Sequence, residues 1–505
     1  MNYLIPGWHD LLTDWAYTVP KIEFDDTVSH VKLLQADDEQ YSLVITDYQP
    51  QLSTKMNQLM LAPKEVVSVF DYLQGIDHLD NRIIDYRDFN WPADAYYDYT
   101  NFRIFVIENN HPYAKITFDT QGKILYVDYL EKEQKTRRLV LDSRGFVSRE
   151  ELFDAGQAYQ HIYYDEQGYW RIKHNLLTDH VEVNNMFSEL TKHHEYTHLS
   201  ELLAEVVQEH ILNNFDIQTD NLIVTLDDEA VIDEKIYQAY QPIYSISRWH
   251  PYKNKLAYLN NHKNSLKLLV DDEETQKNVK EHLKVSPTLL SLFQSRFSLG
   301  HSQRSQRERI GLFVESTDEK DVRQIVEMIY ERLIVSPDKE GLVLLSYSPE
   351  KFYMTQQAIE WLKKQHEGEF ILTSDERNEI EEILMKKKKV PKLSIEAHRI
   401  VTEAEIGKQF DSLRILIDWG NNPDEFIQTT AISTGIPQLY RRPIKRIKDY
   451  QNGLVCKTIK ELNNGLNYYI GNLKHWNESL VYNVQLMNKY STVELLKKWQ
   501  TVLEK

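Results

Sequence analysis

Three evenly spaced turns constrain the middle of this chain more than any other feature of its sequence. They read Asp119-Thr-Gln-Gly122, Asp142-Ser-Arg-Gly145 and Asp165-Glu-Gln-Gly168, and each begins 23 residues after the one before. An Asp that opens a turn accepts hydrogen bonds from backbone N–H groups two residues on, and a Gly in the fourth place tolerates a positive φ. Apolar and aromatic residues alternate around each turn. Period-two patterning interrupted by Gly turns is typical of β-hairpins, so the repeat predicts an antiparallel meander at residues 82–175.

On both sides of this meander the sequence alternates short strands with amphipathic helices. Tyr3–Pro6 and Tyr41–Thr46 are predicted strands before it, and Asn221–Leu226 is a predicted strand after it. Apolar residues from Leu199 to Ile211 recur at i, i+3, i+4 and i+7, which is typical of an amphipathic helix. Strands that alternate with helices imply parallel βαβ units. The meander is therefore predicted to be an insertion in a Rossmann-like lobe.

A second unit of alternating strands and helices follows a polar, basic stretch, His301–Arg309, which is predicted to be a linker. Its predicted strands are Ile310–Glu315, Gly341–Ser346, Glu369–Thr373, Arg399–Thr402, Arg414–Trp419 and Pro437–Tyr440. Because 505 residues are too many for one hydrophobic core, separate domains are expected. The predicted fold class is α/β, with two Rossmann-like lobes and the antiparallel meander inserted in the first. The predicted boundaries are 1–81 and 176–300 for the first lobe, 82–175 for the inserted sheet, and 301–505 for the second lobe with its C-terminal helices.

Charge and cysteine content narrow the classes of partner and compartment. The net charge of −18 disfavours nucleic acid as a partner, since phosphate backbones attract basic proteins. The one cysteine, Cys456, excludes an intramolecular disulfide and fits a reducing compartment. The N-terminus lacks the basic and apolar regions of a signal peptide, and no stretch approaches the roughly 18 apolar residues of a membrane span. A soluble, acidic, cytoplasmic protein with no membrane-spanning segment is expected.

His194-Glu195-Tyr-Thr-His198 fits the H-E-x-x-H pattern of zinc metalloproteases. In those enzymes two histidines on one helix face bind zinc, and the Glu acts as a general base. No downstream motif of recognised spacing supplies a third ligand here, and a five-residue pattern arises easily by chance in a chain with 18 histidines and 77 acidic residues. No metal is therefore expected, and a zinc hydrolase is kept as a minor alternative.

Other catalytic and nucleotide-binding motifs are missing from the sequence. It contains no Gly-x-Ser-x-Gly elbow and no P-loop. After the first predicted strand, Pro6-Gly7-Trp8 stands where a dinucleotide-binding fold has Gly-x-Gly-x-x-Gly. A bulky Trp at a place that needs Gly argues against a nucleotide in the first lobe.

Two basic stretches are candidate anion sites. Arg304, Arg307 and Arg309 beside the linker could bind a diphosphate or an anionic partner, although solubilising a linker is the commoner use of such residues. Arg441–Lys448 follows a predicted strand end, where α/β folds place ligands. A phosphate site and a surface patch for an acidic partner are equally consistent with this second stretch.

The stretch Asp424–Pro437, with Asn452-Gly453 further on, resembles the nucleotide-sugar lobe of two-lobed (GT-B type) glycosyltransferases. These enzymes have an acidic residue five positions before a Gly-x-Pro, and it holds the ribose hydroxyls of the donor. Gly435 and Pro437 match that pattern, whereas the acidic position is Thr430 here. The resemblance implies a degenerate nucleotide-sugar pocket, with no cofactor and no catalytic residue, at Lys320, Thr430, Gly435, Pro437, Arg441 and Arg442.

Four N-terminal segments together resemble the signature of the accessory Sec system protein Asp-one family: Tyr3–Trp8, Phe24–Thr27, Leu43–Leu52 and Val69–Ile76. The resemblance extends over the full length and implies a glycosyltransferase-like fold without transferase chemistry. It also implies a cytoplasmic subunit that works with two companion accessory Sec proteins and the accessory SecA ATPase. Together these proteins deliver a glycosylated serine-rich-repeat adhesin to a dedicated translocon in the membrane, where the subunit would be peripheral.

The leading hypothesis is a non-enzymatic export chaperone or scaffold whose Tyr-rich meander contacts its companions. It depends on the N-terminal signature and on the missing acidic residue at Thr430. The rival hypothesis is an active GT-B type glycosyltransferase that modifies the same adhesin with a UDP-sugar donor. A weak glycan-binding role for the aromatic faces is a further expectation, although core packing explains most of those aromatics equally well.

Overall fold

The computed structural model describes residues 1–9, 25–59, 61, 65–78, 80, 82–100, 103–119, 122–260, 266–293, 299–374 and 390–503. Within this part the chain divides into two compact units. The first unit holds the described residues up to Leu292 and those from Leu496 onward, and the second holds those from Phe293 to Leu495. Phe24, one residue of the N-terminal signature, lies outside the described residues.

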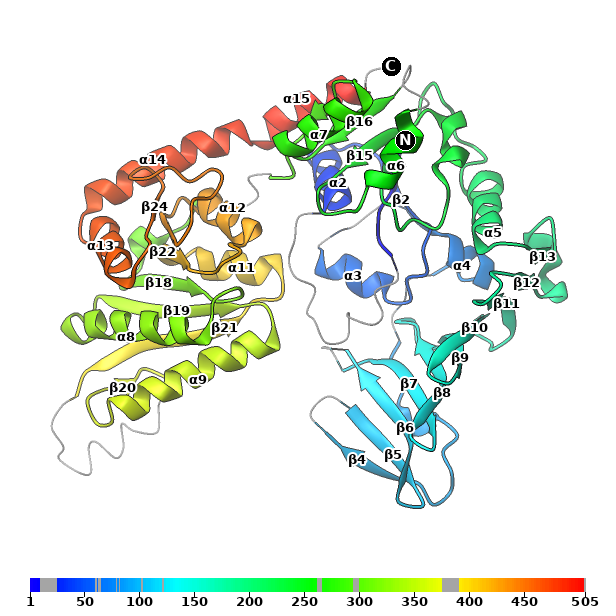
Figure 1. Ribbon diagram of the computed structural model, residues 1–505, viewed down its shortest axis with the longest axis horizontal. Coiled ribbons are helices and arrows are strands. Elements are labelled where there is room, and N and C mark those ends of the chain that lie inside the picture. Colours follow the sequence, from blue (N-terminus) through cyan, green and yellow to red (C-terminus); the bar gives the residue numbers. More distant parts are fainter. Residues whose placement is uncertain are drawn as a thin grey trace. The chain divides into compact units, whose positions relative to one another are not determined.

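A parallel seven-stranded sheet of order β17-β16-β15-β14-β1-β2-β3 is the centre of the first unit (Figure 1). Its strands are β1 (Asn2–Ile5), β2 (Tyr41–Ile45), β3 (Glu65–Ser68), β14 (Asn221–Thr225), β15 (Ile243–Ile246), β16 (Lys267–Val270) and β17 (Thr288–Leu289). Its helices are α2 (Asp26–Ala36), α3 (Leu52–Gln58), α4 (Val69–Gln74), α5 (Leu199–Val206), α6 (Lys253–Asn260) and α7 (Glu273–Leu283). Strand order reverses between β1 and β14, which pair in parallel from Asn2↔Asn221 to Ile5↔Val224. The loops that follow these two strands therefore meet at one edge of the sheet.

An antiparallel ten-stranded sheet is inserted between β3 and β14 (Figure 1). Its strands follow chain order: β4 (Tyr96–Tyr99), β5 (Arg103–Glu108), β6 (His111–Phe118), β7 (Ile124–Glu131), β8 (Gln134–Leu141), β9 (Val147–Asp154), β10 (Gln157–Tyr164), β11 (Trp170–Asn175), β12 (Val181–Val183) and β13 (Glu195–Tyr196). The predicted insert is 82–175, and these strands run on to Tyr196.

The three Asp-x-x-Gly turns connect β6 to β7, β8 to β9 and β10 to β11. Gly122, Gly145 and Gly168 have φ values of 84°, 88° and 83°, as the turn chemistry predicts. Two-residue turns with positive φ, such as Asn109-Asn110, join the strands at the opposite end of the sheet. Each 23-residue repeat therefore corresponds to two strands with one turn of each kind.

The inserted sheet is bound to α4 by residues of the N-terminal signature. The Phe70 ring packs on Tyr163 of β10 with ring centroids 5.1 Å apart. Gln74 is buried, and its Nε2 donates to the backbone oxygen of Ser148 at 2.9 Å and to that of Tyr164. The four-residue spacing of Phe70 and Gln74 on α4 thus positions both side chains against adjacent strands of the sheet.

The loop after β2 also contacts the inserted sheet. Tyr48 packs edge-on against Tyr163, with ring centroids 5.3 Å apart. Gln51 Nε2 donates to the Leu141 backbone oxygen at 2.8 Å, and the Ser143 N–H donates to the Pro50 backbone oxygen at 2.9 Å. Part of the sheet, including Val140 and Tyr163, therefore shares the core of the α/β part, whereas β5–β8 also enclose a separate core around Val106 and Ile116.

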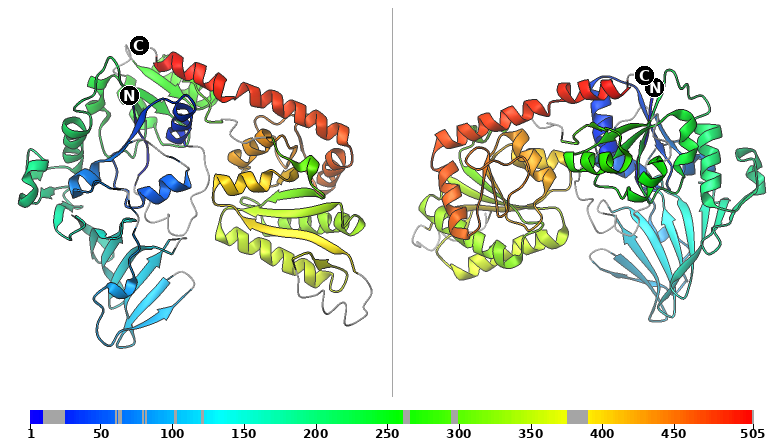
Figure 2. Two further views of the ribbon diagram at one scale, coloured as in Figure 1. Left: turned by 180° about the vertical axis from the view of Figure 1, so that it is seen from behind. Right: turned by 45° about the horizontal axis from the view of Figure 1, so that its top comes forward.

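The second unit contains another parallel seven-stranded sheet, of order β20-β21-β19-β18-β22-β23-β24. Its strands are β18 (Glu308–Phe313), β19 (Glu340–Ser346), β20 (Ile371–Leu372), β21 (Lys392–Arg399), β22 (Leu413–Asp418), β23 (Gln438–Tyr440) and β24 (Gly453–Val455). Helices cover both of its faces (Figure 2). They are α8 (Glu319–Val335), α9 (Pro349–Gln365), α11 (Glu403–Phe410), α12 (Glu425–Thr434), α13 (Ile459–Ile470) and α14 (Leu473–Lys489). The last helix, α15 (Thr492–Leu503), continues into the first unit.

One predicted strand of the second unit is misplaced. The predicted strand Arg399–Thr402 starts where β21 ends, because Thr402 is the N-cap of α11. Its side chain accepts the N–H of Glu405, and the Glu405 carboxylate accepts the N–H of Thr402, which is a capping box. The Thr-x-x-Glu pattern is a helix-start signal that outweighs the apolar residues before it. Among the described residues, no helix combines the length and the apolar character that crossing a membrane requires.

Candidate functional site

Ligands of open α/β sheets bind at the carboxyl ends of the strands, where strand order reverses. In the second unit this point lies between β18 and β22, which pair in parallel. The loops after these strands are joined to each other there. Ser316 Oγ donates to the Asn422 backbone oxygen at 2.7 Å, and the Asn421 N–H donates to the Ser316 backbone oxygen at 3.3 Å. A Cβ on Gly420 would collide with the Ser316 side chain, so only glycine permits this approach.

Carboxylates gather behind the two joined loops. Asp418, at the end of β22, is fully buried and accepts the N–H groups of Gly420 at 3.3 Å and Asp424 at 2.9 Å. Burial raises the pKa of the Asp418 carboxyl to about 7. Glu315 follows β18 and accepts the N–H groups of Tyr347 and Ser348 at 2.8 and 3.2 Å. This edge of the sheet therefore presents acidic groups, whereas a diphosphate is bound by cations and free N–H groups.

Three cations around this edge are bound to protein acceptors. Lys351 Nζ donates to the Thr317 backbone oxygen at 3.0 Å. Arg399 Nε donates to the Tyr347 backbone oxygen at 3.0 Å, and burial lowers the pKa of Arg399. Arg441 forms an ion pair with Asp321 at 2.8 Å.

The sequence-predicted pocket residues occupy several different elements. Thr430 is buried in the middle of α12, where its Oγ1 donates to the Phe426 backbone oxygen at 2.8 Å. Gly435 ends α12 with a φ of 80°, and Pro437 leads into β23. These three residues form one helix–strand connection.

The predicted cations belong to the loop after β23 and to the first turn of α8. Arg441 and Arg442 directly follow β23, and Arg442 is exposed. Lys320 is in the first turn of α8 and lines a groove of about 900 Å³, together with Arg323, Trp361 and Lys460. That groove is bounded by residues of α8, α9 and α13. The structure therefore places Lys320 against a helix groove, with residues that the pocket prediction does not include.

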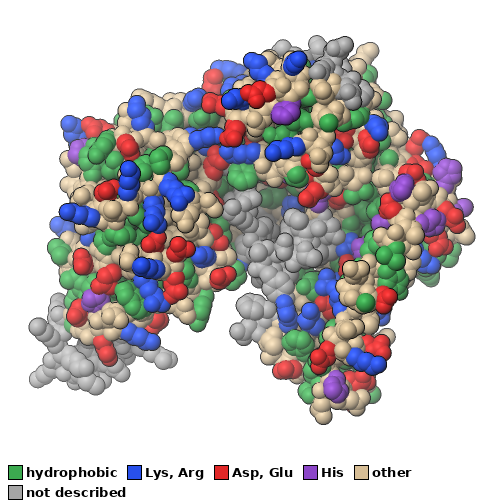
Figure 3. Space-filling view, in the orientation of Figure 1, with side chains coloured by type: hydrophobic (Ala, Val, Ile, Leu, Met, Phe, Trp, Pro, Cys, Tyr) green, Lys and Arg blue, Asp and Glu red, His purple; other side chains and the backbone are tan. Residues whose placement is uncertain are grey.

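The H-E-x-x-H motif does not form a helical metal site. His194 precedes β13, Glu195 is in β13, and His198 is the extended N-cap of α5. The zinc interpretation requires both histidines on one helix face, and that helix begins only at Leu199. Figure 3 shows histidine side chains gathered at this end of the inserted sheet, and the exposed ones are His180, His193, His194 and His198.

Sequence reasoning missed a polar cluster at the corresponding edge of the first unit. Here His9 follows β1, Asp227 follows β14 and His250 follows β15. The Asp227 carboxylate lies 3.0 Å from His9 Nε2 and 2.8 Å from His250 Nδ1. The signal was present in the sequence, because His9 and Asp227 come just after the predicted strands Tyr3–Pro6 and Asn221–Leu226.

Two more carboxylates extend this cluster into an alternating row of acids and histidines. Asp47 lies 3.4 Å from His9 Nδ1, and Asp26 lies 3.4 Å from His250 Nε2. Burial alone would lower the pKa of both histidines, but their carboxylate neighbours raise it to about 9 for His9 and about 11 for His250. Both imidazoles are therefore held as cations at neutral pH by the carboxylates on either side.

Comparison with known proteins gives one consistent result. A family model described as accessory Sec system protein Asp-one matches residues 4–505. A protein of that name from Staphylococcus aureus (strain NCTC 8325 / PS 47) is 25% identical over 536 aligned residues, which cover 100% of this chain and 99% of the relative.

Solved structures show a similar fold. A chain of the Glycosylation Associate Protein (Gap123) complex from Streptococcus agalactiae has a TM-score of 0.80 and 23% identity, with 100% of both chains covered. A chain of accessory secretory protein 1, 2 and 3 from Streptococcus pneumoniae has a TM-score of 0.77 and 24% identity over 100% and 99% of the two chains. A TarM variant from S. aureus, in complex with fondaparinux, alpha-GlcNAc-glycerol and UDP, has a TM-score of 0.61 and 12% identity over 100% and 99%. The predicted fold class, two Rossmann-like lobes of GT-B type with an antiparallel insert, is confirmed.

Proposed function

We propose that this chain, which belongs to the family of accessory Sec system protein Asp-one, is a non-enzymatic subunit of the accessory Sec export system. In this proposal it is a cytoplasmic chaperone or scaffold that helps to deliver a glycosylated serine-rich-repeat adhesin to the accessory SecA motor and the translocon. It would do so with two companion proteins. The similar S. pneumoniae structure, which contains accessory secretory proteins 1, 2 and 3 together, supports that part of the proposal.

The non-enzymatic part of the proposal depends on the joined loops at the carboxyl ends of the strands of the second sheet. The loops after β18 and β22 are hydrogen-bonded through Ser316 and Asn422 at the point where GT-B type folds take a ligand. The N–H groups at the start of α12 are capped by Asp424, whose carboxylate accepts the N–H of Ile427 at 2.9 Å. A diphosphate at this edge would meet the Asp424 carboxylate, with Asp418 buried behind it. Thr430 is also buried in its own helix and offers no carboxylate to a ribose.

Calorimetry with UDP-sugars tests this part. Titration of the full chain with UDP-GlcNAc and UDP-glucose is expected to give no saturable heat. The alternative, an active GT-B type glycosyltransferase, predicts saturable binding together with sugar transfer to the adhesin. Binding and turnover that Arg441→Ala abolishes would establish that alternative and refute the scaffold proposal.

The inserted sheet is the proposed contact surface for the companion proteins. Its first strand, β4, is the sheet edge and carries Tyr96 and Tyr99, which are 51% and 62% exposed. Exposed tyrosines near a strand edge are typical of protein interfaces. Deleting residues 82–175 would also remove Val140 and Tyr163 from the core of the first unit, so point substitutions give a cleaner test.

The double variant Tyr96→Lys/Tyr99→Lys is expected to recover less companion protein when it is purified from cell extract. Tyr353→Lys is the matched control, since Tyr353 is 61% exposed but belongs to the second unit. Recovery of the companions with the double variant at the level of the control would show that the sheet edge is the wrong surface.

A further inference from the structure

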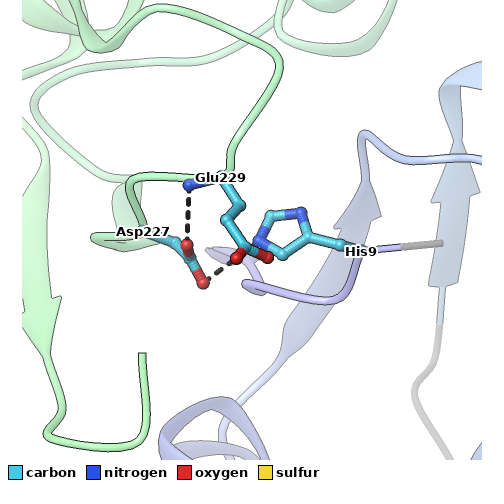
Figure 4. A group of neighbouring side chains, drawn as sticks. All are labelled: His9, Asp227 and Glu229. Atoms are coloured by element: carbon cyan, nitrogen blue, oxygen red, sulfur yellow. Dashed lines mark hydrogen bonds and ion pairs between the residues drawn. The ribbon is translucent and has the colours of Figure 1, made fainter. Parts of the chain in front are cut away.

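A third side chain joins the His9–Asp227 contact at the edge of the first sheet. Glu229 lies two residues after Asp227 in the loop that follows β14. One ligand atom from each of His9, Asp227 and Glu229 lies within 4.8 Å of the other two. Figure 4 shows the three side chains converging from two loops. We propose that His9, Asp227 and Glu229 bind a divalent first-row transition metal ion, in the series from Mn²⁺ to Zn²⁺.

The donor set fits such an ion. One imidazole nitrogen and two carboxylate oxygens suit divalent transition metals, which accept both kinds of ligand. Two ligands that bind one ion at about 2.1 Å lie roughly 3.0–3.4 Å apart. His9 Nε2 and Asp227 Oδ2 are already 3.0 Å apart. The metal ion takes the place of the His9 proton, and the two carboxylates with the deprotonated imidazole carry a charge of −2, which a divalent ion cancels.

Neighbouring groups orient two of the three ligands. Asp227 is buried, and its Oδ1 accepts the N–H of Glu229 at 2.9 Å, which fixes the turn between the two acidic residues. Asp47 faces the other ring nitrogen of His9 at 3.4 Å. A carboxylate behind the ligating histidine is a regular feature of metal sites, because it fixes the ring orientation and the tautomer. Asp47 is therefore a positioning residue for His9.

Glycine 7 makes the approach of the two loops possible. A Cβ on Gly7 would lie 3.0 Å from the His250 ring and 3.1 Å from Asp227 Oδ2. Both distances are shorter than ordinary van der Waals contact. The Pro6-Gly7-Trp8 segment of the N-terminal signature thus brings His9 beside Asp227, at a place where sequence reasoning expected only the absence of a phosphate loop.

A second group of potential ligands in the same unit is less suited to a metal. Asp25, Asp26 and His250 also lie within 4.8 Å of one another. However, Asp25 accepts hydrogen bonds from Trp8 Nε1 at 2.7 Å and from the N–H of Val28 at 2.8 Å. Its carboxylate is thereby bound to the start of α2. Glu229 is exposed and makes no such contact with another described side chain, so it can bind an ion from solvent.

Titration of Mn²⁺ into the full chain, after removal of metals by chelation and dialysis, tests the proposal. Free Mn²⁺ is counted by its electron paramagnetic resonance signal. One bound Mn²⁺ per chain is expected, with the affinity reduced at least about tenfold in Glu229→Gln, since loss of even a supporting group costs 10- to 100-fold. Glu189→Gln is the matched control, because Glu189 is an exposed glutamate of the same unit outside the cluster. Its affinity is expected to equal that of the unchanged chain.

A second measurement identifies the ligand type. Pulsed electron paramagnetic resonance of the bound Mn²⁺ is expected to show the hyperfine coupling to the nitrogen of a directly bound imidazole. His9→Gln is expected to remove this coupling. His194→Ala, in the exposed histidine group, is expected to leave the coupling unchanged. The proposal is overturned by any one of three results: no saturable Mn²⁺ binding, equal binding by Glu229→Gln and the control, or a nitrogen coupling that depends on His194. The metal-site proposal is independent of the proposed export role. That role is tested separately, by calorimetry with UDP-sugars and by recovery of the companion proteins.

Discussion

The guanidinium of Arg144 forms a two-point ion pair with the Asp71 carboxylate, at 2.7 Å from Nη2 to Oδ1 and 2.9 Å from Nη1 to Oδ2. Arg144 lies in the second Asp-x-x-Gly turn, and Asp71 lies on α4. The same guanidinium contacts Asp142 at 2.8 Å. The middle turn is therefore buried against the α/β part, whereas a Cβ on Gly122 or Gly168 in the other two turns would meet nothing within 4 Å. The middle turn is thus bound to α4 through Arg144, and the third turn contacts the segment after α4 through the ion pair of His78 with Glu166 at 2.7 Å.

Replacing Arg144 with Ala is expected to destabilise the first unit by about 3–5 kcal/mol, because two carboxylates lose their partner in a largely buried place. Urea unfolding followed by tryptophan fluorescence measures the loss. Arg87→Ala is the control, since Arg87 pairs with Asp85 at an exposed position and its removal is expected to change little. Equal effects of the two substitutions would show that the turn does not bind the sheet.

Gln74→Ala is expected to lower the free energy of unfolding by about 2–4 kcal/mol, because the buried backbone oxygens of Ser148 and Tyr164 lose their hydrogen-bond donor. The substitution should also loosen β9 and β10 and raise hydrogen exchange at Ser148 and Tyr164. Gln157→Ala, at an exposed position of β10, is the control for both measurements. Unchanged exchange in Gln74→Ala would show that α4 does not hold the sheet.

Asp418 gives the second unit a pH-dependent stability. Its carboxyl has a pKa of about 7 in the folded protein against an ordinary value of 3.8, so the folded state retains the proton that the unfolded state loses. This contribution is complete below pH 3.8 and is lost as the pH rises through 7. Asp418→Asn, which is neutral at every pH, is expected to gain about 2–3 kcal/mol relative to the unchanged chain between pH 5 and pH 8. Asp338→Asn, at an exposed site, is expected to show no such trend, and a parallel trend in both variants would refute this role of burial.

The last turns of α15 complete the core of the first unit. Trp499 is 1% exposed, and its ring stacks on His30 of α2 with centroids 4.9 Å apart. Trp499→Ala is expected to cost about 3–5 kcal/mol through the cavity that it leaves. Val493→Ala, on the same helix but 61% exposed, should have an effect within about 0.5 kcal/mol. Equilibrium unfolding of both variants decides between core packing and a dispensable tail.

Local chemistry made the inserted sheet predictable from the sequence. Each Asp-x-x-Gly turn specifies its own backbone within four residues, and alternation specifies the strands beside it. Reliance on local sequence also made the prediction at Arg399–Thr402 wrong, because the apolar residues before a helix N-cap were interpreted as a strand. The cap at Thr402 was itself a local signal, and giving it more weight would have placed the boundary correctly.

The His9–Asp227 contact could not be read in this way, because its members are 218 residues apart. Only the pairing of β1 with β14 brings them together. The rule that ligand-binding side chains follow the strands at a reversal of strand order would have indicated both residues, once the order of strands was known. For the second unit, the sequence indicated the loss of an acidic residue at Thr430. It did not indicate that buried carboxylates such as Asp418 come to lie at that edge.

The return of α15 to the first unit sets the order in which this protein can mature. Domains usually fold from the N-terminus while synthesis continues, at about 5–20 residues per second. Here the first unit contains Trp499 and Val502, whose backbone oxygen accepts a hydrogen bond from Lys267 Nζ at 3.1 Å. The second unit can therefore finish first, although it is made later. A chain that stops before residue 499 has an N-terminal unit without this buried side chain, so the first unit is complete only after the second unit has been synthesised.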